Sequence, residues 1–337
     1  MKAKKWLTLG LLILLSMLIA AGCGGDTKEQ DSTSQDGSKK QAGDNVDIKA
    51  LTAQWVESKH SNILLSPAQR DECVVCHDGG AFAENITEVA AIERDFFISV
   101  DCRACHTGQG ADLMEEGKVT IPTAEKVQGG SGAVCMFCHN SRTAPNIEDE
   151  NRSAPHYSSQ ADLATGTGGM RLEGFDYGNT SAHVNIDDSC VGCHLLETEG
   201  GYASHSFKVD KVEAACGQCH QDINDLNLTA AGDYDGDGQE EGFQTEVEGL
   251  LALLQAAVGE ELAGGSFESG HGAVVFKDAE GAALDEVPKE MYQAGYNYLL
   301  ISSDGSLGIH NPTLTVQLLQ QSYKGLTGED VPKAKLK

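Results

Sequence analysis

The hydrophobic pattern divides the sequence into segments of different kinds. An apolar run from Trp6 to Ala21 follows three lysines near the start. Residues 24–45 then contain a single apolar side chain, which is too few to bury a core. From about residue 50 to 225 the apolar positions show no sustained period and clusters of glycine interrupt them, so we expect little continuous helix or sheet there.

Beyond residue 225 the pattern becomes that of helices. Apolar residues in 245–262 recur at intervals of three and four, which predicts a helix with one buried face. Residues 288–301 and 312–323 predict two further helices, each beginning at or beside a proline. A small helical cap is therefore expected after the irregular region.

The first 22 residues have the pattern of an export signal. Lys2, Lys4 and Lys5 precede an apolar run that is shorter than the roughly 20 residues needed to span a bilayer. The run ends in Ala20-Ala21-Gly22-Cys23, which resembles a bacterial lipoprotein signal. The resemblance implies that residues 1–22 are removed, that Cys23 is lipidated and that residues 23–49 form a flexible tether. An uncleaved anchor and a plain secreted protein are the alternatives, and all three place the body on the extracytoplasmic side, in the periplasm or at the cell surface.

Ten of the 11 cysteines lie in five copies of Cys-x-x-Cys-His. This is the attachment motif of c-type haem, in which two thiols one helical turn apart add to one porphyrin edge and the histidine becomes the proximal iron ligand. We number the motifs 1 to 5 in chain order: Cys73/Cys76/His77, Cys102/Cys105/His106, Cys135/Cys138/His139, Cys190/Cys193/His194 and Cys216/Cys219/His220. The sequence therefore predicts five covalent haems.

Three other uses of paired cysteines fit the pattern less well. Zinc ribbons do not need a histidine after every pair, and five triplets divide unevenly into four-coordinate sites. A thioredoxin-like pair occurs once, beside a βαβ pattern. Structural disulfides would not repeat one local spacing five times.

Six further histidines can supply the second axial ligand of each iron. Five haems need five distal ligands, and we expect them to be His60, His156, His183, His205 and His310. His271 lies in a flexible glycine context and is left out. Methionine could also be an axial ligand, but Met114, Met170 and Met291 share no recurrent sequence context. The sequence does not decide which distal histidine serves which haem.

An acidic segment after the haem motifs is a candidate calcium site. Asp233, Asp235, Asp237, Gln239 and Glu241 alternate around a glycine at the sixth position, which resembles the first half of an EF-hand loop. The twelfth position is Gln244 where that family has glutamate, so Glu241 or Glu246 would have to substitute. A solvated acidic turn is the alternative.

Charge and cysteine content limit the partners and the architecture. A net charge of −27 excludes the cationic surface that DNA or RNA binding needs. We expect a mostly irregular and α-helical fold, with a pentahaem core over 50–225, a calcium-like loop and helical cap over 226–330 that is integrated with the core through His310, and a tail over 331–337.

These residues together resemble the multihaem c-type cytochromes, in particular the surface and periplasmic members of metal-reducing bacteria. Beyond the five motifs, the resemblance rests on Ser153–His156, Gly166–Gly169, Tyr177–Asn179, the aspartate loop and Gly308–Pro312. It implies an electron carrier that links a quinol-oxidising membrane donor to an external reductase, metal or filament.

Two other functions stay open at this point. One is a multihaem reductase of the nitrite reductase type with one open haem, although the Cys-x-x-Cys-Lys motif of that type is absent from the sequence. The other is a subunit of a cytochrome filament. An iron with two histidine ligands has no vacant position, which favours electron transfer over catalysis.

Overall fold

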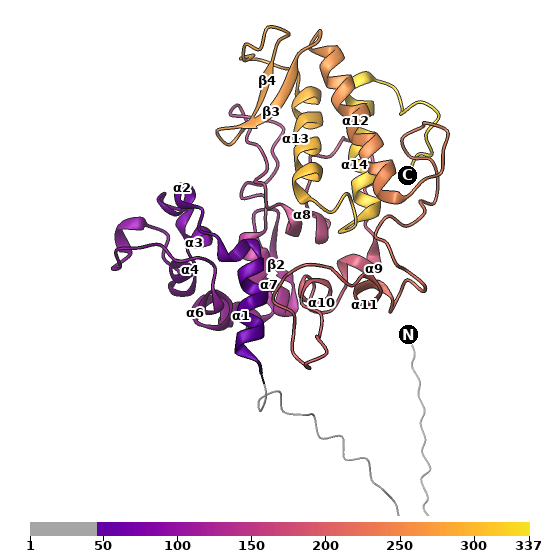
Figure 1. Ribbon diagram of the computed structural model, residues 1–337. Coiled ribbons are helices and arrows are strands. Elements are labelled where there is room, and N and C mark those ends of the chain that lie inside the picture. The colour runs from indigo at the N-terminus through magenta and orange to yellow at the C-terminus, as the bar shows by residue number, and fades with distance from the viewer. Residues whose placement is uncertain (1–45) are drawn as a thin grey trace, which may run out of the picture. The chain divides into compact units, whose positions relative to one another are not determined.

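The computed structural model describes residues 46–337, so the predicted signal, the lipidation site Cys23 and most of the tether lie outside the described residues. The part that carries the five motifs consists of short helices joined by long connections (Figure 1). Its helices are α1 (Ile48–Glu57), α2 (Leu65–Ala68), α3 (Val74–His77), α4 (Gly79–Glu84), α5 (Cys102–His106), α6 (Gly108–Glu116), α7 (Ala133–Cys138), α8 (Gln160–Ala164), α9 (Ser181–Val184), α10 (Val191–His194) and α11 (Val212–Cys216), with 3-10 turns at Lys59–Ser61, Val89–Ala91 and Gly130–Gly132.

These short helices stop because local chemistry stops them. Asp78 caps α4 by accepting a hydrogen bond from the Ala81 N–H at 2.8 Å, and its buried carboxylate also pairs with Arg94. At the other end of α4, Asn85 adopts a left-handed conformation with φ 53°. Helices of four to ten residues are marginal in isolation, so tertiary contacts must hold them.

A small hairpin interrupts this region and was not predicted. Strand β1 (Lys118–Ile121) pairs antiparallel with β2 (Ala124–Gln128). In β1 the buried side chains Val119 and Ile121 alternate with exposed ones and pack on Ala133 and Met136 of α7. The strand is too short for its alternation to stand out in the sequence.

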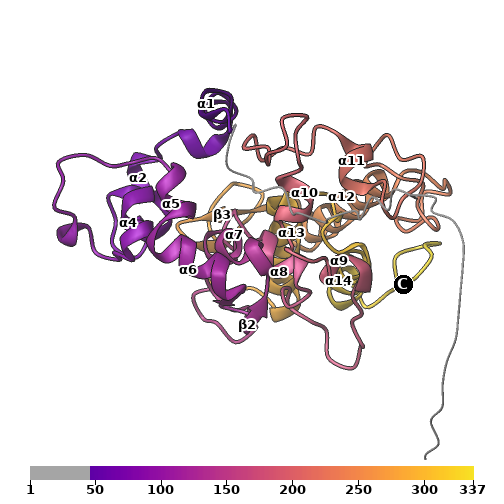
Figure 2. The same ribbon diagram turned by 90° about the horizontal axis from the view of Figure 1, so that it is seen from below.

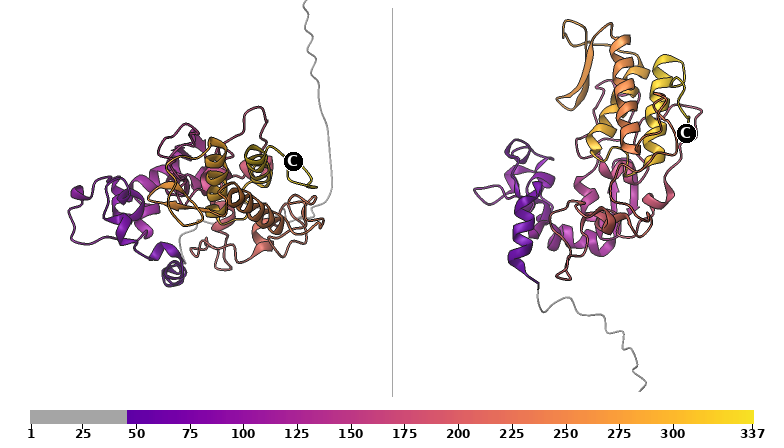
Figure 3. Two further views of the ribbon diagram at one scale, coloured as in Figure 1. Left: turned by 90° about the horizontal axis from the view of Figure 1, so that it is seen from above. Right: turned by 45° about the vertical axis from the view of Figure 1, so that its right-hand side comes forward.

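The C-terminal region contains the predicted helical cap. Helices α12 (Phe243–Glu261), α13 (Lys289–Asp304) and α14 (Pro312–Thr327) pack on one another (Figure 3). Pro288 is the N-cap of α13, and Pro312 begins α14 as predicted. Both helices run a few residues past the predicted ends because the left-handed glycines that terminate them are Gly305 and Gly328.

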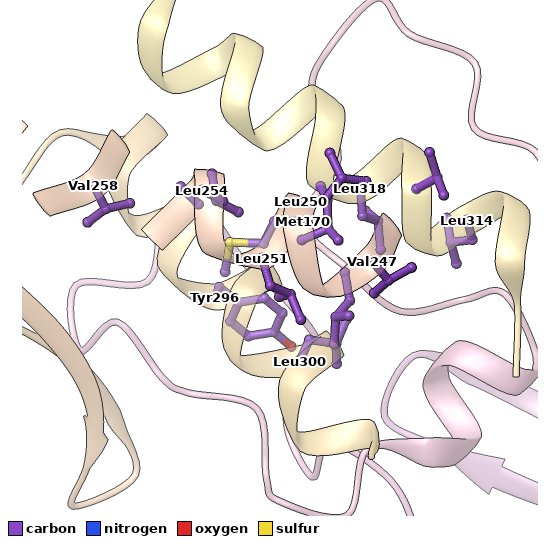
Figure 4. Close-up of a cluster of buried hydrophobic side chains, with 14 of the residues drawn as sticks. Met170, Val247, Leu250, Leu251, Leu254, Val258, Tyr296, Leu300, Leu314 and Leu318 are labelled. Atoms are coloured by element: carbon purple, nitrogen blue, oxygen red, sulfur yellow. The ribbon is translucent and has the colours of Figure 1, made fainter. Parts of the chain in front are cut away.

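A conventional aliphatic core holds the three helices together. Leu250 and Leu254 of α12, Leu300 of α13 and Leu318 of α14 are all at most 2% exposed and meet at the centre (Figure 4). Met170, from the irregular region, completes the cluster. Burying side chains of this size contributes about 1.5–3 kcal/mol each, so this region has a large source of stability of its own.

A second hairpin covers one side of the cap and was also not predicted. Strands β3 (Ser266–Gly270) and β4 (Ala273–Lys277) pair in regular antiparallel register. Val274 and Phe276 of β4 are fully buried against the helical core, which again gives an alternating pattern. His271 is at the tight turn between the strands, exposed and with φ 53°.

Hydrogen bonds connect the cap with the segment before α9. The buried side chain of Asn297 accepts a bond from the Met170 N–H at 2.8 Å and donates to the Met170 carbonyl at 2.7 Å. Asn311, the N-cap of α14, accepts from the Thr180 N–H and donates to the Leu163 carbonyl. The leucine core and these bonds both include residues from the middle of the chain.

Candidate functional site

Each attachment motif folds as a tight helical turn. The histidine N–H donates to the carbonyl of the first cysteine in motifs 1, 3, 4 and 5, and α5 contains motif 2 whole. These bonds are 3.1 Å from His77, 2.9 Å from His139, 2.9 Å from His194 and 2.8 Å from His220. The turn therefore holds each histidine immediately beside its cysteine pair.

Motif 5 departs in part from the helix expected there. Helix α11 ends at Cys216, so Cys219 is not on a helix but in the turn that follows, where its N–H donates to the Cys216 carbonyl at 3.1 Å. Gly217, a weak helix former, occupies the position at which α11 stops. The Cys219 side chain is exposed, as is that of Cys102 in motif 2. This corrects the expectation that both thiols of every motif lie along one regular turn of helix, and the thioether at Cys219 stays a prediction.

The structure brings every motif histidine next to one of the five candidate distal histidines. The ring centroids of the five pairs are all separated by nearly the same distance. The pairs are His77–His156 at 6.2 Å, His106–His205 at 6.2 Å, His60–His139 at 6.0 Å, His194–His310 at 6.3 Å and His183–His220 at 6.2 Å.

These pairs do not follow chain order. His60 precedes motif 1 but faces His139 of motif 3, and His156 follows motif 3 but faces His77 of motif 1. His310 lies in the turn two residues before α14, and His183 lies on α9. His271 has no aromatic neighbour among the described residues, and Met170 and Met291 are buried in the leucine core.

Several of these rings are held through Nδ1, which leaves Nε2 free to face the partner ring. The Nδ1 atoms of His183, His194 and His205 lie 2.7, 3.0 and 2.9 Å from backbone carbonyls. His139 donates to the amide oxygen of Gln160 at 3.0 Å. Such a bond fixes the ring orientation and the tautomer.

His310 differs from these, because its Nδ1 meets a carboxylate. The distance to Asp304 Oδ1 is 2.6 Å, and the Asp304 side chain is 0% exposed. Burial lowers the pKa of His310, but the hydrogen bond and negative charge of Asp304 outweigh burial and leave the pKa raised.

The other shifted histidines are kept neutral. Burial, helped by the charge of His139, lowers the pKa of His60 to about 4. Burial, helped by the charge of Arg142, lowers the pKa of His156 to about 4. A neutral imidazole is the form that binds a metal, so these surroundings favour ligation at neutral pH.

Arg142 supplies a test of whether a haem fits beside motif 1. Its guanidinium lies beside Cys76. Burial lowers the pKa of both His77 and His156, and the positive charge of Arg142 lowers them further. Yet its Nη2 atom is buried without a hydrogen-bond partner in the described chain. A buried donor of this kind needs an acceptor, and the carboxylate of a haem propionate has the chemistry to supply one.

Contacts between cysteines give the neighbours of each motif. The thiol of Cys76 in motif 1 lies beside that of Cys138 in motif 3, and the thiol of Cys135 in motif 3 lies beside that of Cys190 in motif 4. Cys105 of motif 2 shares an apolar cluster with both cysteines of motif 3. Helix α11 of motif 5 packs on α10 of motif 4 (Figure 2). Motif 3 therefore has three neighbouring motifs.

The aspartate loop forms a compact acidic turn. Asp233, Asp235 and Asp237 bring carboxylate oxygens within 4.8 Å of one another. Beneath the loop the buried carboxylate of Glu246 accepts bonds from the N–H groups of Tyr234 and Glu241, at 2.7 and 3.1 Å. Gln239 and Glu241 are exposed.

Sequence reasoning missed the residues that support the histidines. Gln160, Asp304 and Phe207 belong to no motif and lie 21, 6 and 13 residues from the rings they bind. Phe207 also contacts the His60 ring, with centroids 4.6 Å apart, and has φ 58°. The left-handed backbone conformation is the one feature that distinguishes Phe207, and it cannot be read from the sequence.

Two comparisons with known proteins find similarity. Residues 170–331 match the sequence profile of the cytochrome c552 family. The crystal structure of the outer cell wall cytochrome OcwA is similar at 20% sequence identity and a TM-score of 0.50, over 81% of this chain and 50% of that one. This chain thus spans half the length of that structure. No curated protein gives a significant match. Within residues 46–337, no helix is long and apolar enough to cross a membrane.

Proposed function

We propose that this chain, a multihaem c-type cytochrome by its motifs and fold, holds five haems with two histidine ligands each and passes electrons along them. The haems would be thioether-linked at the five Cys-x-x-Cys pairs, with the motif histidine on one face of each iron and its facing histidine on the other. The observation that carries the proposal is the set of five histidine pairs with centroids 6.0–6.3 Å apart. When bound, haem supplies a one-electron iron couple.

The spacing has the value expected for two imidazoles on opposite sides of one metal. Metal–nitrogen bonds of about 2.0 Å on either side of one metal would put two imidazole rings at a separation of this size. Histidines packed only on each other would vary more in separation. Five similar distances in chemically different surroundings therefore support a common occupant.

Two imidazoles at each site favour transport over catalysis. A reductase needs an iron position that substrate can enter, and each motif histidine here has a facing histidine. A filament subunit would take one ligand from the next copy, but here one chain supplies all ten rings. A reductase with an open haem and a filament subunit isolated as a single chain would each have fewer than five low-spin irons.

The motif contacts suggest the route of the electrons. Motif 3 adjoins motifs 1, 2 and 4, and motif 5 adjoins motif 4, so the route would branch at motif 3. The motif histidines His106 and His220 are exposed, whereas the other three are partly buried. The same two motifs contain the exposed cysteines Cys102 and Cys219. Motifs 2 and 5 are therefore the proposed points of exchange with partners.

Electron paramagnetic resonance of the oxidised holoprotein tests the coordination. We expect five low-spin centres in the wild type. His156→Ala should convert one centre to high spin, because it removes one face of ligation, while His271→Ala should leave all five unchanged. A stoichiometric high-spin centre in the wild type would instead indicate an open haem and a reductase.

We further propose an extracytoplasmic location, with a lipid on Cys23 that keeps the cytochrome at a membrane face. The export signal supports this location. A quinol-oxidising donor and an external acceptor, whether a reductase, a metal or a filament, would be the partners. Because the charge of −27 attracts cationic surfaces, electron transfer to a basic partner should slow as salt rises. Stopped-flow rates that do not depend on ionic strength would contradict this steering.

Calcium at the aspartate loop is a separate proposal. Asp233, Asp235 and Asp237 already converge, and oxygen ligands of this kind suit a hard cation. Calorimetry should detect calcium binding to the wild type and a weaker affinity in Asp237→Asn, which changes an exposed side chain. If calcium releases no heat and leaves the thermal unfolding midpoint unchanged, the loop is only a solvated turn.

A further inference from the structure

The environment of His310 is unlike that of the other paired histidines. In the part of the chain that the structure describes, it is the one paired histidine that has a carboxylate within hydrogen-bond distance of its ring nitrogen. His139 meets an amide oxygen, His156 a hydroxyl, and His183, His194 and His205 meet backbone carbonyls. The difference is one of charge, because only Asp304 can carry a full negative charge.

The fold holds this carboxylate in place. Asp304 is the last residue of α13, and Gly305, with φ 74°, turns the chain out of the helix. Ser306 then donates to Asp304 Oδ2 from its N–H, at 3.2 Å, and from its hydroxyl. Asp304 Oδ1 is left to accept from His310. Both oxygens are thus occupied on a side chain with no exposed surface.

The same helix end also supports His139, but with a neutral group. Gln160 donates from Nε2 to the Asp304 carbonyl at 3.0 Å, and its Oε1 accepts from His139 at 3.0 Å. Motifs 3 and 4 are neighbours through Cys135 and Cys190. Two adjacent sites therefore share one anchor while their ligands meet an amide in one case and a carboxylate in the other.

We propose that Asp304 is a positioning residue that lowers the reduction potential of the haem of motif 4 below that of the neighbouring haem of motif 3. A histidine that donates to a carboxylate becomes a more basic ligand, and a buried negative charge nearby favours the ferric over the ferrous iron. Both effects lower the potential. The inference rests on the coordination proposed above.

The consequence is an uneven route. An electron shared between motifs 3 and 4 would reside on the haem of motif 3. Transfer onward to motif 5 would then pass through an uphill step at motif 4. Asp304 would thereby set the direction in which electrons collect along the chain.

Asp304→Asn tests the proposal by potentiometric titration of the holoprotein. The substitution keeps an acceptor for His310 and removes the charge, so one of five midpoint potentials should rise while four stay. His310→Met identifies the affected haem, because methionine ligation raises the potential of the same centre. Asp149→Asn is the matched control: it removes a partly buried carboxylate that hydrogen-bonds the backbone N–H groups of Asn151 and Ser153. It should leave all five potentials unchanged.

Gln160→Glu tests the effect of a carboxylate on a histidine ligand in the opposite direction. Its result does not depend on whether Asp304→Asn is stable. It places a carboxylate on His139, so the potential of a different single haem should fall. Five unchanged potentials in Asp304→Asn, an equal rise of all five, or no fall in Gln160→Glu would each overturn the proposal. Failure of the coordination itself would appear separately, as a high-spin centre in the wild-type spectrum.

Discussion

The haem-motif region and the C-terminal cap are stabilised in different ways. The cap has three helices of 16 to 19 residues around a core of fully buried leucines. The motif region has helices of four to ten residues, and its two apolar clusters are small. What the motif region has in place of a core is five histidine pairs at nearly equal spacing.

The comparison teaches where stability and function reside. In the cap, aliphatic side chains fill the interior. In the motif region the two apolar clusters are small, and the buried Arg142 Nη2 beside motif 1 has no hydrogen-bond partner among the described residues, as expected beside a proposed haem. We therefore expect the two regions to respond differently to the same treatments.

The largest difference should appear when haem is withheld. If the chain is expressed without residues 1–22, the predicted signal, in a compartment where haem is not attached, the motif region loses its proposed interior while the leucine core remains. Limited proteolysis with mass spectrometry should show rapid cleavage within 50–225 and survival of α12 to α14. Equal protection of the two regions would remove the distinction.

Leu254→Ala should damage the cap and spare the haems. Leu254 is 0% exposed, and shortening such a side chain costs about 2–5 kcal/mol through lost contacts and a cavity. Denaturant unfolding followed by far-ultraviolet dichroism should report this loss, while haem content stays at the wild-type value. Leu336→Ala, at a residue 49% exposed, is the matched control and should change the unfolding free energy by about 0.5 kcal/mol or less.

Asn311→Ala should weaken the junction between the regions. It removes the N-cap of α14 beside His310, which costs about 0.5–2 kcal/mol, and leaves the Thr180 N–H without its acceptor. Because His310 is the adjacent residue, one low-spin signal should also shift. Asn185→Ala, at an exposed asparagine bonded only to Ser181, should change neither measurement.

Lys277→Ala should have the smallest effect. Its ion pair with Glu268 joins β3 and β4 at 2.7 Å, but the two side chains are 31% and 59% exposed. Solvent weakens such pairs to about 0–1 kcal/mol, so thermal unfolding in low and high salt should be nearly the same for wild type and variant. A loss of stability larger than this would mean that the ion pair stabilises the hairpin more than an exposed pair is expected to.

The sequence by itself determined the chemistry and most of the local elements. Five Cys-x-x-Cys-His motifs are local patterns, so their number and their tight turns can be read directly, although α11 ends before Cys219. The three cap helices were predicted because a 3.6-residue period extends over 16 residues or more, and Pro312 fixed one start. The two hairpins were missed because strands of four or five residues carry too short a period.

Only the tertiary structure decided which residues meet. His60 faces His139, which is 79 residues away in the sequence, and His310 faces His194, which is 116 residues away. No local pattern predicts contacts over such separations. Asp304 and Gln160 are ordinary in sequence and acquire a role because the end of α13 presents Asp304 to His310 and anchors Gln160 of α8, which bonds His139. Side-chain type is a property of the chain, whereas the charge that surrounds a ligand is a property of the fold.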